Sequence, residues 1–71
     1  MALAGLLKQL REDRGITQEQ LAFDAGITAS ALSRIERGLN SPGWTTVRRL
    51  AQALDVPLVR LAGEVEEASS Q

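Results

Sequence analysis

The sequence contains no cysteine, no histidine and no tyrosine, and it has a single lysine. Without cysteine no disulfide can form, and without cysteine and histidine nearly all transition-metal sites are excluded. The many serine and threonine hydroxyls have no base to activate them, and no glycine-rich phosphate loop is present. We therefore expect no catalytic activity, no metal, no cofactor and no small-molecule ligand.

Long apolar stretches are also missing. The N-terminal segment MALAGLLKQL is too short and too soon charged to be a signal peptide. No run approaches the ~18 apolar residues of a membrane span. With 71 residues the chain forms one domain at most, and its core must be small. We expect a cytoplasmic protein without membrane contact, for which self-association is the remaining source of extra stability.

Charge is unevenly distributed along the chain. The formal net charge is −1, which argues against a generic nucleic-acid binder. Up to Arg60, however, the sequence contains eight basic and six acidic residues. The other three acidic residues are Glu64, Glu66 and Glu67. The body can therefore present a basic face while the C-terminal end makes the total negative.

The apolar pattern is helical throughout, since no stretch alternates as a strand does. We predict an all-α protein, with Thr17 and Gln20 forming a capping box and Thr28 capping the third helix. The expected helices, in chain order, span about 2–14, 18–26, 29–37, 44–54 and 57 onward. The residues expected to face inward on the fourth are Trp44, Val47, Leu50, Ala51 and Leu54.

The stretch from Gln18 to Arg37 holds two short helical patterns separated only by Gly26. Helices joined so tightly cross steeply, and a residue without a Cβ suits the junction. The second helix then stands out from the body as a rod that fits the major groove of DNA. This pattern predicts a helix-turn-helix over about residues 17–37.

The segments TQEQLA, AGIT, ALSRIERG, SP and LAQALDVPLVRL occur in register. Together they resemble the Cro/C1-type helix-turn-helix family of phage repressors and small bacterial regulators. The resemblance covers residues 6–61 and leaves 62–71 as the acidic end of the fifth helix and a tail. It implies a five-helix, lambda-repressor-like domain that binds operator DNA in the major groove as a symmetric homodimer.

The resemblance also implies roles for individual residues. Arg34 is expected to carry most of the base reading, because arginine bonds guanine O6 and N7 with two prongs. Gln18 is expected to contact a phosphate and to brace the start of the third helix. The full base-reading set is Ala29, Ser30, Ser33 and Arg34. The full phosphate-contacting set is Gln18, Thr28, Arg37, Asn40 and Ser41.

Four further positions take their interpretation from the same resemblance. Arg11 is expected to form a structural ion pair with Glu36, in preference to a DNA contact. Trp44 is expected to pack in the core rather than to stack on bases. Phe23 occupies a position that is usually polar, and the sequence does not decide whether it packs or forms an exposed apolar patch.

Apolar residues of the fifth helix exceed what one small domain can cover. We predict a dimer interface there, which would place two recognition helices roughly 34 Å apart on a near-palindromic site. Its residues are Leu58, Val59, Ala62 and Val65.

Sequence-specific regulation of transcription, as a repressor or autoregulator, is therefore the leading functional expectation. The alternatives are an antitoxin, a restriction–modification controller, or a module whose main partner is another protein. The chain could also be a fragment of a longer regulator.

Overall fold

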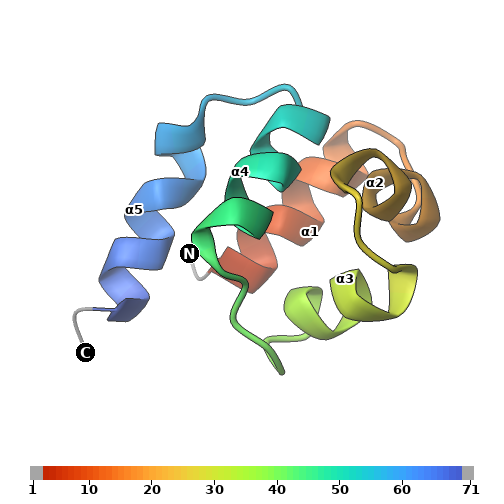
Figure 1. The fold of residues 1–71 in the computed structure, drawn as a ribbon. Coiled ribbons are helices and arrows are strands. Elements are labelled where there is room, and N and C mark those ends of the chain that lie inside the picture. Colours follow the sequence, from red (N-terminus) through yellow and green to blue (C-terminus); the bar gives the residue numbers. More distant parts are fainter. Residues whose placement is uncertain (1–2, 70–71) are drawn as a thin grey trace.

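The structure is a computed structural model that describes the backbone of residues 3–69 and the side chains of residues 3–63. Five helices and no strand lie within these residues, which confirms the all-α prediction. Figure 1 shows their arrangement. The helices are α1 (Leu3–Asp13), α2 (Gln18–Ala25), α3 (Ala29–Glu36), α4 (Trp44–Ala53) and α5 (Leu58–Ser69).

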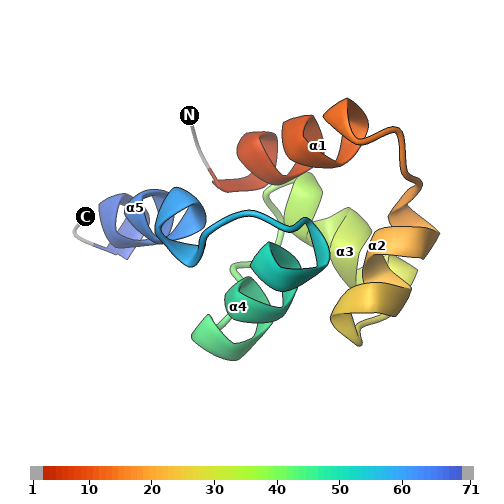
Figure 2. The same cartoon turned by 90° about the horizontal axis from the view of Figure 1, so that it is seen from above.

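The helices pack around one centre, in a body with a radius of gyration of 10.8 Å. α2 packs against both α3 and α4, α1 contacts α3 and α5, and α4 contacts α5. In both Figure 1 and Figure 2, α5 lies at one side of the molecule and α2 at the opposite side. The helix-turn-helix and the predicted dimer surface are thus at different sides of the domain.

Each helix contributes one leucine of zero exposure to the core. Burying such a side chain stabilises the fold by roughly 1.5–3 kcal/mol before chain entropy is counted. These leucines are Leu7, Leu21, Leu32, Leu50 and Leu61. Around them lie Ala22, Ala25, Ile35, Val47, Ala51 and Leu54, so that α2, α3 and α4 supply most of the core.

The first four helices end in the same way, with a left-handed residue followed by an apolar one. The left-handed residues are Gly15, Gly26, Gly38 and Asp55. In each case two backbone bonds of the Schellman pattern close the helix. The apolar residues that follow are Ile16, Ile27, Leu39 and Val56. Three of these four pack against the core, whereas Leu39 remains exposed.

Most helix limits agree with the sequence-based prediction to within one residue, and the predicted caps at Thr17 and Thr28 are present. Pro57 differs slightly, because it directly precedes α5 instead of opening it. Among the described residues no helix is long and apolar enough to cross a membrane.

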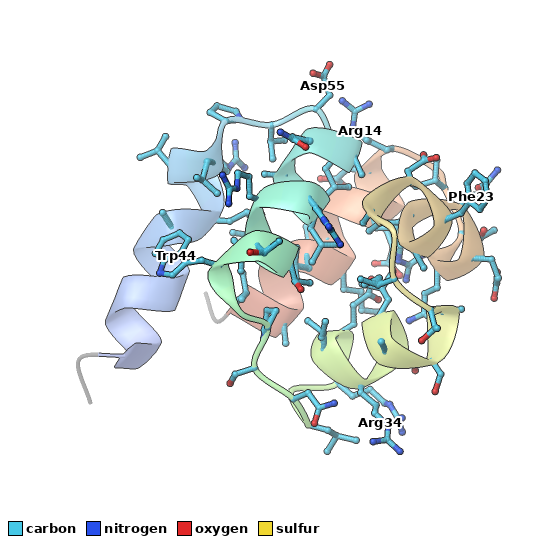
Figure 3. The ribbon with its side chains drawn as sticks, in the orientation of Figure 1. Arg14, Phe23, Arg34, Trp44 and Asp55 are labelled. Carbon is cyan, nitrogen blue, oxygen red and sulfur yellow. The ribbon has the colours of Figure 1, made fainter. Side chains whose placement is uncertain are left out.

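The prediction that Trp44 packs in the core is wrong. Its spacing from Val47 fits the inner stripe of α4, yet Trp44 is 51% exposed. Trp44 is the first residue of α4, and in the view of Figure 3 its side chain projects toward the side of the molecule where α5 lies. Register alone therefore placed it correctly on the helix, but the position along the helix left it half uncovered.

Candidate nucleic-acid interface

The α2–α3 unit is fixed by local hydrogen bonds at each junction. Gln20 N donates to Thr17 Oγ1 at 3.1 Å, and Thr17 N donates to Gln20 Oε1 at 2.8 Å. At the turn, Gly26 adopts φ +73°. Ala31 N donates to Thr28 Oγ1 at 3.0 Å, which satisfies one free amide at the start of α3. Both helices therefore begin at defined residues, and α3 is held at a fixed angle to α2.

α3 has one face in the core and one in solvent. Leu32 and Ile35 anchor the inner face, while Ser30 and Arg34 are exposed on the outer face. Ser33 is half-buried. Ala29 is half-buried as well and packs against the core, so its methyl group faces outward only in part. Figure 3 shows Arg34 pointing away from the body of the domain.

Glu36, the last residue of α3, has a buried carboxylate held by three nitrogen atoms. Arg11 Nε donates to Oε2 at 2.9 Å and Arg11 Nη2 donates to Oε1 at 3.1 Å. The structure thus contains the ion pair that the resemblance implied. The hydrogen bond with Glu36 raises the pKa of Arg11 above its ordinary value. Arg11 Nη1 also donates to the Ile16 carbonyl at 3.0 Å, so one side chain joins α1, the α1–α2 loop and α3.

Gln18 supplies the third nitrogen. Its Nε2 donates to Glu36 Oε1 at 3.0 Å, which links the first residue of α2 to the last residue of α3. The expectation that Gln18 braces the start of α3 is therefore wrong, because Gln18 braces the C-terminal end of α3 instead. The Gln18 side chain meets the carboxylate at the C-terminal end of α3, so the contact is made at that end of the helix. Because an amide has two N–H groups, one still remains for a phosphate.

The segment after α3 carries three of the predicted phosphate contacts. Arg37 is exposed and its Nε donates weakly to the Ser33 carbonyl at 3.4 Å. Asn40 and Ser41 are exposed in the following loop. Thr28, at the opposite end of α3, is also exposed. The predicted phosphate contacts therefore flank the reading face at both of its ends.

The predicted dimer residues differ in exposure. Val59 is 76% exposed, Ala62 is half-buried, and Leu58 is half-buried and packs against the core. The side chain of Val65 lies outside the described residues. Phe23 is 85% exposed on α2 and lies on the side of the molecule opposite α5 (Figure 3).

Sequence reasoning did not select Leu39, which is 63% exposed and lies three residues after the end of α3. Its signal was available, because it is the one large aliphatic residue in the turn GLNSPG, which otherwise contains glycine, proline and two polar residues. A turn residue of this kind is readily dismissed until its exposure and its neighbours are known.

Comparison with known proteins agrees with this geometry. A family model described as a helix-turn-helix domain matches residues 2–62. The chain belongs to this family. Residues 2–62 include all of α2, the turn and α3, so the match covers the interface described above.

Two curated relatives and one solved structure illustrate the similarity. The HTH-type transcriptional repressor RghR of Bacillus subtilis is 43% identical over 65 residues, which cover 86% of this chain and 48% of that protein. An uncharacterized HTH-type regulator, y4dJ of Sinorhizobium fredii, is 39% identical over 83% of this chain and 77% of its own length. The chain therefore spans about half the length of RghR but most of y4dJ.

The solved structure is that of the restriction–modification controller protein C.AhdI from Aeromonas hydrophila. It matches with a TM-score of 0.81 and 34% identity, over 83% of this chain and 89% of that one. The match therefore includes the amino-acid sequence as well as the arrangement of the helices, and it covers most of both chains.

Proposed function

We propose that this helix-turn-helix protein is a sequence-specific DNA-binding regulator of transcription that places α3 in the major groove. The observation that carries the proposal is the two-faced α3, with Leu32 and Ile35 locked in the core and Arg34 projecting into solvent. An α-helix fits the major groove, and an arginine on it can read guanine. We propose that the protein binds DNA in the cytoplasm and that residues 6–61 form the DNA-binding domain.

Electrostatics support this role despite the negative net charge. From residue 29 to residue 41 the charged residues are Arg34, Glu36 and Arg37. Glu36 is buried and paired with Arg11, so the exposed charges of this segment are both positive. A surface of this sign attracts the phosphate backbone, whereas the three acids after Arg60 follow on α5, away from α3.

The test is selection of bound sequences from random duplex DNA at two salt concentrations. We expect one enriched site whose affinity falls steeply with salt. Arg34→Ala should weaken binding by about 1–3 kcal/mol per half-site and relax preference at one position. The matched variant Arg37→Ala should weaken all sequences alike and lower the salt slope by about 1 per half-site. Uniform weakening by Arg34→Ala would assign Arg34 to phosphate instead.

We further propose that the protein acts as a homodimer through α5 on a near-palindromic site. Val59 supports this, because it is a large exposed aliphatic residue on a helix that leaves the reading face free. Sedimentation should show a dimer at micromolar protein, and Val59→Glu should shift it to a monomer. Phe23→Glu is the matched control, because it places the same charge at an equally exposed site on the opposite side. A wild-type monomer, with and without DNA, would contradict the dimer.

One observation favours a second function, the binding of a protein partner at α2. Beside Phe23 lies a shallow hollow of about 400 Å³ lined by Ile16, Glu19, Gln20, Phe23 and Asp24. Such a partner fits the antitoxin, controller and interaction-module alternatives. The variant Phe23→Ser distinguishes the two functions, because it should weaken binding of the protein partner and leave DNA binding unchanged. If random-sequence selection enriches no site while a partner binds at Phe23, the second function replaces the first.

A further inference from the structure

Leu39 differs from its three counterparts at the other helix ends. Ile16, Ile27 and Val56 each follow a left-handed residue, and each packs against the core. Leu39 follows Gly38 in the same pattern, with Gly38 N donating to the Ile35 carbonyl at 3.0 Å and Leu39 N donating to the Arg34 carbonyl at 2.9 Å. The local geometry is the same in all four, yet Leu39 is left 63% exposed.

The neighbours explain why Leu39 is uncovered. In a Schellman motif, the residue after the left-handed one is turned back against the residues three and four positions from the helix end. For α3 these are Arg34 and Ser33, which are polar and belong to the predicted reading face. An apolar side chain is therefore placed beside the base-reading residues and outside the hydrophobic core that the described residues form.

In the major groove the apolar group that a base pair presents is the C5 methyl of thymine. We propose that Leu39 is a specificity-determining residue that contacts a thymine methyl next to the position read by Arg34. This inference rests on the proposed DNA-binding function and extends it, because it assigns the module a thymine preference that its serines and arginine do not supply. The contact removes the exposed Leu39 side chain from water and packs it against the methyl group.

The experiment compares the sites selected by the wild-type protein and by Leu39→Ala. We expect the wild-type site to contain a thymine in each half-site at a position where Leu39→Ala shows no preference. Replacing that thymine by deoxyuridine removes only the methyl group. It should weaken wild-type binding about fourfold per half-site and leave Leu39→Ala binding unchanged.

Controls separate the possible failures. Deoxyuridine at other thymines should affect wild type and Leu39→Ala equally, and Phe23→Ala should retain the wild-type response. Circular dichroism checks that Leu39→Ala is folded, which its exposure leads us to expect. If Leu39→Ala selects the same site and shows the same deoxyuridine penalty, Leu39 does not read the methyl group and the inference is overturned. If the wild-type protein enriches no site, the proposed function itself fails, and this is seen before any variant is used.

Discussion

Arg11 and Glu36 form a two-pronged ion pair between α1 and the last residue of α3, with nitrogen–oxygen distances of 2.9 and 3.1 Å. Their side chains are 13% and 2% exposed, so the pair is almost removed from water. The pair holds the C-terminal end of α3 and neutralises the one carboxylate within residues 29–41. The same ion pair therefore stabilises the domain and removes a negative charge from the proposed DNA-binding surface.

Removing Arg11 should be costly, because it leaves the Glu36 carboxylate buried with Gln18 as its remaining side-chain donor. We expect Arg11→Ala to lower the free energy of unfolding by about 3 kcal/mol in urea denaturation. The double variant Arg11→Met/Glu36→Leu should recover most of this loss, since an apolar pair needs no desolvation. Arg14→Ala is the control, because its 3.6 Å pair with Asp55 is exposed and should contribute below about 0.5 kcal/mol. Equal losses for Arg11→Ala and Arg14→Ala would contradict a structural role for the buried pair.

The same pair gives an expected pH response. The pKa of Arg11 is raised in the folded state, chiefly by its hydrogen bond to Glu36. A base whose pKa rises on folding contributes its full stability below its unfolded pKa and loses it only as the pH passes its folded pKa. The stability difference between wild type and the double variant Arg11→Met/Glu36→Leu, which has no unpaired buried carboxylate, should therefore stay constant from neutral to mildly alkaline pH. A decrease of this difference over that range, measured by urea titration, would contradict the assignment.

Gly26→Ala should destabilise the helix-turn-helix. The φ of +73° costs an L-residue roughly 1–2 kcal/mol, whereas a Cβ at this position would make only ordinary contact with Arg49 Nη1 at 3.8 Å. Backbone strain, rather than a clash, is thus the expected cause. Gly43→Ser is the matched control, because Gly43 has φ −74°, lies at the N-cap of α4 and has open space around it. Thermal melting should show a lower Tm for Gly26→Ala and an equal or slightly higher Tm for Gly43→Ser.

Asp55 should respond to substitution with opposite signs. It has φ +56° at the end of α4. The left-handed residues that end α1, α2 and α3 are all glycines. We expect Asp55→Gly to stabilise the protein by about 0.5 kcal/mol, because relief of strain exceeds the added chain entropy. Asp55→Ala should destabilise it by about 1 kcal/mol, since the strain remains and the tolerance of aspartate for this conformation is lost. Chemical denaturation measures both, and a stabilising Asp55→Ala would show that strain is not the controlling factor.

Thr28 offers a test of phosphate contact that does not disturb the fold. Its Oγ1 accepts the Ala31 amide, which leaves the hydroxyl proton free to donate to a phosphate. Thr28→Ser and Thr28→Asp should both retain the cap and keep stability within about 0.5 kcal/mol. Thr28→Asp cannot donate and repels phosphate, so DNA affinity should fall about tenfold or more, while Thr28→Ser stays near wild type. Unchanged affinity for Thr28→Asp would place Thr28 away from the DNA backbone.

Much of the local structure was predictable from the sequence because its causes are local. Thr17 and Gln20 satisfy free amides within their own helix, and a glycine after a helical stretch ends it wherever the helix lies in the fold. The outward direction of Arg34 follows from the inward spacing of Leu32 and Ile35. The ion pair of Arg11 and Glu36 came only from the family resemblance, since 25 residues separate the partners.

The sequence by itself determined which segments are helical, where they begin and end, and which face of each is apolar. Only the tertiary structure decided which apolar residues are covered. Trp44 fits the inner stripe of α4, yet it lies at an end that neighbouring helices cover only in part. Leu39 repeats the pattern of Ile16, Ile27 and Val56, but α3 turns it toward its solvent-facing side. Burial depends on what other elements bring to a position, and sequence spacing within one helix does not contain that information.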